Sequence, residues 1–288
     1  MIVVLSLLAA LCYGAADFCG GLASRRTSAL AVVVCSQLAG LLVLILVLPL
    51  VPGIPRPIDL AIGAFCGISG AFAVAFLYRA LAIGVMGVVS PVTAVLAAAI
   101  PVLWAFVHGE RPTPLALAGI CCALVAVVLI SASSTASESE APLSRKAPRR
   151  LFPPGIASAL AAGTAFGIFF IILARTHADA GLFPLLGTRV ASLTLLILGA
   201  LVLRRSLRVS RPALRTILIG GVLDMIANVF YVLAAHRGEL SIVAVLTSLY
   251  PAGTVALAAM VLRERLARFQ WVGVAAAFVG VVCISLTS

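Results

Sequence analysis

The stretch TAVLAAAIPVLWAFVHGERPTPLALAGICCALVAVVLIS, residues 93–131, aligns without a gap with TSLYPAGTVALAAMVLRERLARFQWVGVAAAFVGVVCIS, residues 247–285. The offset is constant at 154 residues, and about a third of the paired positions are identical. Apolar composition raises such scores, but matched polar residues at one offset arise less easily by chance. The pair Glu110-Arg111 meets Glu264-Arg265 in this alignment. We therefore predict that the chain is a duplication of one unit.

Composition places this duplicated chain in a membrane. Of its 288 residues, 63% are hydrophobic and 10% are charged, whereas soluble domains are about a quarter charged. The net charge of +11 could suggest nucleic-acid binding. The arginines instead lie between apolar blocks, as they do in cytoplasmic loops of membrane proteins. We therefore expect a lipid bilayer, and no nucleic acid, as the partner of this surface.

Ten apolar blocks are long enough to cross about 30 Å of hydrocarbon as helices. They are residues 2–23, 29–51, 58–80, 84–107, 113–133, 154–175, 182–203, 213–235, 239–262 and 267–287. The predicted fold is an all-α membrane protein with ten transmembrane helices, arranged as two inverted five-helix repeats. The first repeat covers 1–133 and the second 154–288. Residues 134–153 are polar and rich in Ser and Pro, which predicts a flexible cytoplasmic linker.

Inversion follows from the odd number of helices, since the second copy must enter the membrane from the other side. The positive-inside rule tests this, because corresponding loops should then differ in charge. The connection between the second and third blocks carries Arg56 alone, whereas its counterpart in the second copy carries five arginines. Over all loops, the odd-numbered connections hold 15 Lys and Arg and the even-numbered ones four. This count predicts cytoplasmic odd connections, with both termini outside the cell.

The order of these features resembles the EamA-type members of the drug/metabolite transporter superfamily. The resemblance is carried by Tyr13-Gly-Ala-Ala-Asp-Phe18 with Gly21 and Arg25-Arg26, by the two Glu-Arg steps, and by the Gly-led fifth and tenth blocks. It implies two five-helix domains and secondary transport of small metabolites or drugs, often outward, through a central cavity. Members are usually drawn with both termini in the cytoplasm, so the charge count given above departs from the family pattern.

Ionisable residues within the apolar blocks are the first candidates for a site, since they cost about 2.5–3.5 kcal/mol at mid-membrane. Asp224, Asn228 and Tyr231 are spaced i, i+4, i+7 and share one helical face. That face must point to the protein interior or to a water-filled cavity. The pattern indicates either a binding or coupling site or a hydrogen-bond network that only fixes helix packing.

Two further positions leave similar alternatives open. Asp17 follows Tyr13 by one turn, and it could face a substrate or pair with Arg25, Arg26 or Arg79. Arg189 lies about two turns into the seventh block, and either an anionic substrate group or Asp224 could neutralise it.

Prolines inside the blocks are candidates for gating kinks, because a proline removes a hydrogen bond and frees the carbonyl four residues earlier. Pro91 and Pro101 lie in the fourth block and Pro251 in the ninth. Broken helices at corresponding places of two repeats indicate a transporter binding site. The nearby side chains that could contact a substrate are Thr93 in the first repeat and Thr247 and Tyr250 in the second. Simple packing kinks are the alternative.

The sequence therefore predicts a secondary transporter in the cell (inner) membrane. We expect an exporter of small metabolites or drugs that works by alternating access and is open to proton coupling through Asp17 or Asp224. A membrane-embedded enzyme or a channel is the alternative, but the sequence has none of the usual hydrolase or metalloprotease motifs. The seven cysteines lie in apolar blocks without Cys-x-x-Cys pairs, so we expect no metal and no cofactor.

Overall fold

A computed structural model describes residues 1–24, 27–83, 86–132, 155–261 and 268–286. These residues form eleven α-helices and two short 3-10 helices, and none of them forms a strand. The all-helical prediction is confirmed. The predicted linker, 134–153, and the step Glu264-Arg265 lie outside the described residues.

The helices follow the predicted apolar blocks within a few residues at each end. Their bounds are α1 Ile2–Ser24, α2 Ala29–Val47, α3 Pro57–Ile83, α4 Met86–Val107, α5 Pro114–Ala132, α6 Ile156–Ala174, α7 Phe183–Val202, α8 Arg211–Ala235, α9 Leu240–Thr247, α10 Tyr250–Val261 and α11 Arg268–Ser285. The 3-10 helices η1, Leu48–Leu50, and η3, Ala178–Ala180, follow α2 and α6. Apolar block length was therefore sufficient to place the helices of every block except the ninth.

The ninth apolar block forms two helices because the chain breaks at Ser248 and Leu249, between α9 and α10. Pro251 has no N–H to offer the carbonyl of Thr247, which would be its partner in a continuous helix. Helix α4, by contrast, is helical without interruption through both Pro91 and Pro101.

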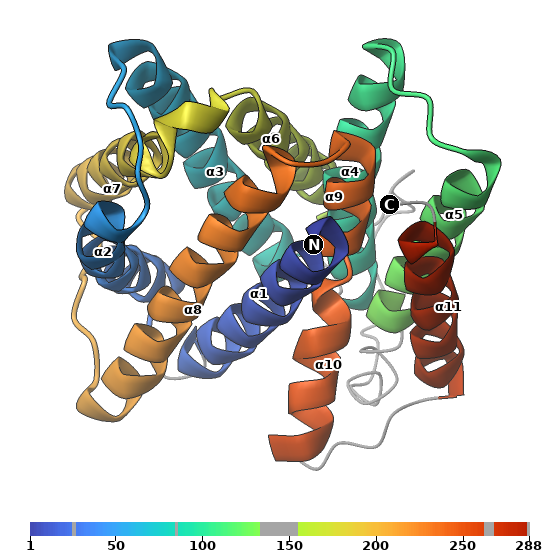
Figure 1. The fold of residues 1–288 in the computed structure, drawn as a ribbon. Coiled ribbons are helices and arrows are strands. Elements are labelled where there is room, and N and C mark those ends of the chain that lie inside the picture. Colours follow the sequence, from blue (N-terminus) through green and yellow to red (C-terminus); the bar gives the residue numbers. More distant parts are fainter. Residues whose placement is uncertain (25–26, 84–85, 133–154, 262–267, 287–288) are drawn as a thin grey trace.

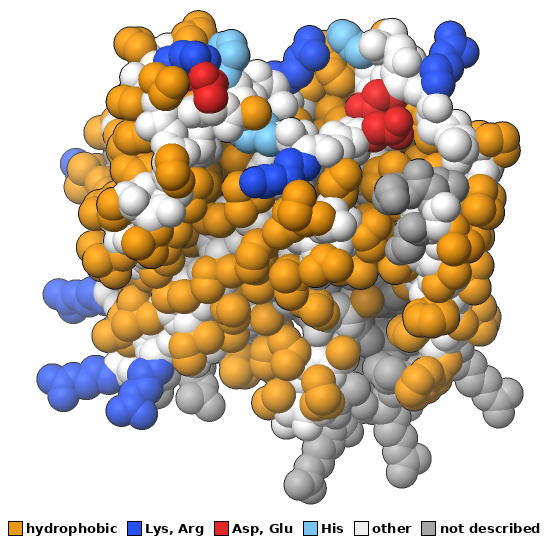
Figure 2. Space-filling model, viewed as in Figure 1, with side chains coloured by type: hydrophobic (Ala, Val, Ile, Leu, Met, Phe, Trp, Pro, Cys, Tyr) orange, Lys and Arg blue, Asp and Glu red, His pale blue; other side chains and the backbone are white. Residues whose placement is uncertain are grey.

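The surface of the bundle matches a hydrocarbon environment. Six described helices, α1, α2, α3, α6, α7 and α8, are long and apolar enough to cross a membrane, and four apolar stretches in the other helices are shorter. Figure 2 shows a broad band of hydrophobic side chains, with the charged side chains on this face gathered toward its upper and lower edges. Such a band is what a multi-pass membrane protein presents to lipid.

The helices pair across the two halves of the sequence. Helix α1 packs on α8 and α10, and α6 packs on α3 and α4, while α2 contacts α8 and α3 contacts α7. Small residues allow these close contacts. A Cβ atom at Gly67 would lie 2.2 Å from the carbonyl oxygen of Thr188 in α7, and one at Gly14 would lie 2.4 Å from that of Tyr250 in α10. Larger residues at either glycine would separate the helices.

Two ends of the bundle can be distinguished. The connections α2–α3, α4–α5, α6–α7 and α8–α9 lie at the end that Figure 1 places at the top, called here the upper edge. Ile2 at the start of α1 packs against Gly238 of the α8–α9 connection, so α1 also starts there. The α7–α8 connection, with Arg204, Arg205 and Arg208, lies at the opposite end, called here the lower edge.

Candidate functional site

An ion pair at membrane depth joins two helices. The guanidinium of Arg189 in α7 donates a hydrogen bond to Oδ2 of Asp224 in α8. The Arg189 side chain is 7% exposed and that of Asp224 33%. Of the partners considered for Arg189 from the sequence, the structure selects Asp224. Because Asp224 compensates its charge, Arg189 can remain charged in this buried position.

Neighbouring amide and hydroxyl groups extend this polar region. Asn228 is buried and donates from Nδ2 to the backbone oxygen of Asp224, at 2.7 Å. One turn after Arg189 along α7, the Ser192 hydroxyl donates to Oε1 of Gln37 in α2, at 2.5 Å. Tyr231 is fully buried, and its hydroxyl donates to the carbonyl oxygen of Phe170 in α6, at 3.0 Å. The polar face of α8 therefore links α7 and α6.

Asp17 in α1 differs from Asp224 in having no partner. It is exposed, and no hydrogen bond or ion pair to it is formed among the described residues, which include the Arg79 side chain but not those of Arg25 and Arg26. Its electrostatic neighbours are Asp224 in α8 and Tyr250 in α10. A bare carboxylate facing lipid would be costly, so we expect the exposed side of Asp17 to contact water.

An aromatic cluster lies above these carboxylates. Tyr13 stands edge-on to Phe170 with ring centroids 6.3 Å apart, and Phe170 lies 4.8 Å from the ring of Tyr231 and 5.3 Å from that of Phe169. These residues belong to α1, α6 and α8. The hydroxyl of Tyr13 is buried and has no hydrogen-bond partner in the part of the chain that the structure describes.

Accessibility changes across this aromatic cluster. Toward the upper edge, Ser6 and Ala9 of α1 are fully buried, as is Val232 of α8. Toward the lower edge, Asp17 is exposed, and Cβ atoms at Gly20 and Gly21 would meet nothing within 4 Å. Asp17 is thus exposed below the aromatic cluster, whereas Ser6, Ala9 and Val232 above it are buried.

Two hydrogen-bonded contacts hold the upper edge together. In the first, Arg56 of the α2–α3 connection donates to both oxygens of Asp179 in η3, at 2.9 and 2.5 Å. Beside it, the buried carboxylate of Asp59 at the start of α3 accepts from the backbone N–H of His177 and contacts its ring Nδ1, both at 3.0 Å. The α2–α3 connection and the start of α3 are thus hydrogen-bonded to the α6–α7 connection.

The second contact joins α4 to the broken helix. Glu110, which follows α4, accepts hydrogen bonds from the backbone N–H groups of Leu240 and Ser241, at 2.8 and 3.1 Å, and from the Ser241 hydroxyl, at 2.7 Å. A carboxylate at a helix N-terminus is favourable because it satisfies N–H groups that lack helical partners. Glu110 therefore fixes the start of α9.

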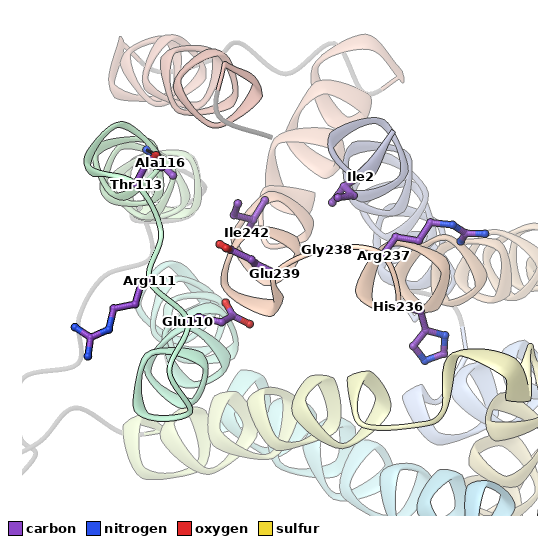
Figure 3. Close-up of a pocket in the computed structure, with 10 residues that line it drawn as sticks. All are labelled: Ile2, Glu110, Arg111, Thr113, Ala116, His236, Arg237, Gly238, Glu239 and Ile242. Carbon is purple, nitrogen blue, oxygen red and sulfur yellow. Dashed lines mark hydrogen bonds between the residues drawn. The ribbon is translucent and has the colours of Figure 1, made fainter.

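A pocket of about 620 Å³ lies next to this contact at the upper edge. Figure 3 shows that the carboxylates of Glu110 and Glu239 lie toward its interior, whereas the guanidinium groups of Arg111 and Arg237 point away from it. Ile2 and Ile242 contribute apolar walls. This pocket lies at the helix ends and is lined by none of the residues around Asp17 and Asp224, so we do not assign it as the central site.

The three predicted site residues near the prolines, Thr93, Thr247 and Tyr250, differ in their hydrogen-bond partners and neighbours. Thr93 is buried and donates to the carbonyl oxygen of Ala159 in α6, at 3.3 Å. Thr247, at the end of α9, is buried, and its hydroxyl has no partner within the described residues. Tyr250 starts α10 and lies near Asp17. Of the predicted site residues, Tyr250 thus joins the carboxylate site, whereas the hydroxyl of Thr93 bonds to the backbone of helix α6.

Sequence reasoning missed the residues of the upper edge and the two phenylalanines of α6. Asp59 could have been found, because it is an acidic residue just inside an apolar block. Nothing in the sequence pattern distinguishes Phe170 from the other apolar residues of α6. Within the described ranges, no group of three or more His, Cys, Asp or Glu is arranged to hold a metal ion.

Comparison with known proteins adds the following. The model of the EamA-like transporter family matches residues 1–132 and, separately, 153–286. No curated protein matches the sequence. A solved crystal structure of a protein superposes with a TM-score of 0.79, covering 99% of this chain and 96% of the other at 18% sequence identity. At that identity the likeness is evidence for the fold alone.

Proposed function

Because the chain belongs to the EamA-like transporter family, and is therefore a membrane transporter of the drug/metabolite transporter superfamily, we propose that it is a secondary transporter of small metabolites or drugs. In this proposal it is no enzyme, and it exports its substrate across the cytoplasmic membrane by alternating access. The substrate crosses between two inverted five-helix repeats. The observation that carries the proposal is the polar site of Asp17, Arg189 and Asp224 within the apolar helices α1, α7 and α8.

The proposed repeats, 1–133 and 154–288, are supported by three observations. The family model matches the chain twice, with limits close to these. The helix contacts come in corresponding pairs, since α1 with α8 matches α6 with α3, and α2 with α8 matches α7 with α3. The close contact of Gly67 with Thr188 also has a counterpart in that of Gly221 with Ser36, at the same 2.2 Å.

The state described here corresponds to one end of an alternating-access cycle. The upper edge is closed by the Arg56–Asp179 and Glu110–Ser241 contacts and by the aromatic cluster, while Asp17, below that cluster, is exposed. Opening the upper side would require these contacts to break and the aromatic rings to separate. The interrupted segment at Ser248 and Leu249 would let α9 move relative to α10 once the contact between Glu110 and Ser241 breaks.

Coupling to protons belongs to the same proposal. Asp224 is a weak candidate for the carrier, because its charge already compensates Arg189. Asp17 has no such partner among the described residues and is accessible, so it is the better carrier.

An unbiased transport screen tests this function. Proteoliposomes are incubated with a metabolite extract, and the contents of the vesicles are identified by mass spectrometry with and without a proton gradient. We expect compounds that accumulate in wild-type vesicles but not in vesicles without protein, and we expect Asp17→Asn to remove the effect of the gradient. Absence of any protein-dependent accumulation would refute the transporter proposal.

Orientation needs its own experiment. The arginines of the lower edge lead us to propose that this edge faces the cytoplasm and that both termini lie outside. A reporter that is active only in the cytoplasm should then be active when inserted near Val209 and silent when fused after Ser288. A signal from the fusion at Ser288 would reverse the orientation without affecting the repeat.

A further inference from the structure

We propose that the substrate is an amphiphilic organic cation, an amine with an aromatic or apolar body, whose ammonium group binds Asp17. This inference rests on the proposed function, because it names the substrate class of the same site. It is drawn from the charge balance of that site, from the side chains around Asp17, and from the apolar character of the closed end.

The charge balance is the first step. The ionisable side chains of the site are Asp17, Asp224 and Arg189. Arg189 and Asp224 compensate each other, so the charge of −1 that Asp17 carries when it is ionised has no counter-charge among the described residues. An anionic substrate would meet this uncompensated charge at membrane depth, where charge interactions are strong. A cation would neutralise it.

The side chains next to Asp17 are the second step. Tyr13 lies one helical turn away on the same face of α1, and Tyr250 is a neighbour from α10. A carboxylate flanked by tyrosine rings suits an ammonium group, because the ring faces attract cations. The buried Tyr13 hydroxyl, which has no partner among the described residues, could accept one N–H of an amine.

The closed end of the site is the third step. Beyond Tyr13, toward the upper edge, the site is bounded by the rings of Phe170, Phe169 and Tyr231. The Tyr231 hydroxyl is already bonded to the backbone of α6. These rings offer apolar contacts and few free polar groups, so a sugar or another highly hydroxylated compound would lose hydrogen bonds with water on binding. An apolar or aromatic body would not.

A matched ligand series tests the charge requirement. The probes are 3-phenylpropan-1-amine, 3-phenylpropan-1-ol and 3-phenylpropanoate, which share one body and differ in charge. Binding is measured by thermal stabilisation of the purified protein, which depends on ligand affinity. We expect the amine to bind about 10- to 100-fold more tightly than the alcohol, the range for one hydrogen bond to a charged group. The carboxylate should bind most weakly.

Variants assign the effect to Asp17. Asp17→Asn keeps the shape and should remove the preference for the amine over the alcohol. Glu239→Gln is the control, because this carboxylate is exposed at the upper edge and lies outside the site. If Asp17→Asn does not fold, the ligand order in the wild-type protein still decides. An amine that binds no better than the alcohol, or a preference that survives Asp17→Asn, would overturn the inference.

The transport screen separates this inference from the function on which it rests. If protein-dependent accumulation is confined to anions or neutral compounds, the protein is a transporter and the substrate class is wrong. If nothing accumulates, the transporter proposal itself fails. Accumulation of amines that compete with 3-phenylpropan-1-amine supports both.

Discussion

Arg189 and Asp224 form a buried ion pair, and we predict that removing Asp224 costs more stability than removing Arg189. Asp224→Asn leaves the guanidinium of Arg189, 7% exposed, without its counter-charge. Arginine cannot release its proton to escape this, so the unfolding free energy should fall by about 3–5 kcal/mol, the cost of breaking a buried ion pair. The Asp224 side chain is 33% exposed and can contact water. Arg189→Met should therefore cost only about 1–3 kcal/mol, as for one lost hydrogen bond to a charged group.

The double variant is the decisive measurement. Arg189→Met with Asp224→Asn carries no unpaired charge, so it should be more stable than Asp224→Asn alone. The wild type, the two single variants and the double variant form a double-mutant cycle. Their free energies of unfolding can be measured at equilibrium in mixed micelles of a mild detergent and SDS. The exposed pair Arg56–Asp179 provides a matched control cycle, with an expected coupling of about 0.2–1 kcal/mol. Simple additivity at Arg189 and Asp224 would refute the claim that each charge depends on the other.

Three further predictions concern moving parts and pH. Pro251→Ala restores a backbone N–H and should join α9 to α10, with a large loss of transport and little loss of stability. The movement can be measured by the labelling of single cysteines on the two membrane faces. If labelling is unchanged on both faces, Pro251 is a packing residue only. Asp179→Asn should weaken the closed upper edge and raise the labelling of cysteines placed there, and unchanged labelling would remove this contact from the gate. Burial lowers the pKa of His236, despite the opposing hydrogen bond with Thr176, so its contribution to stability should be present above about pH 6.5 and lost as the pH falls below it. Melting temperatures at pH 5 and pH 7 should therefore differ less in His236→Gln than in the wild type, and an equal difference would contradict the assignment.

Much of the fold was predictable because a hydrocarbon environment constrains it strongly. Every backbone polar group must be satisfied inside the bilayer, so long apolar blocks become helices. The blocks at 29–51 and 182–203 correspond to α2 and α7 within a few residues. Helix α9 illustrates the limit. Pro251 indicated an interruption near Thr247, but the same reasoning did not distinguish it from Pro101, where α4 stays helical.

The candidate site was predictable residue by residue but not in its pairing. Asp17, Arg189 and Asp224 were identified because ionisable residues are costly in apolar helices. Sequence alone left two partners open for Arg189 and several for Asp17. Only the tertiary structure, in which Arg189 of α7 reaches Asp224 of α8, leaves Asp17 as the exposed carboxylate without a partner among the described residues.

The sequence by itself determined that this protein lies in a membrane, that it is helical, and, within a few residues, where most of its helices begin and end. These properties depend on local hydrophobicity and on backbone hydrogen bonds formed within a few residues. Tertiary structure decided which charges cancel, as for Arg189 and Asp224, and which contacts close the upper edge, as for Glu110 at the start of α9. Such contacts join residues more than 30 positions apart, and their energy depends on distance and burial, which become defined only when the helices pack.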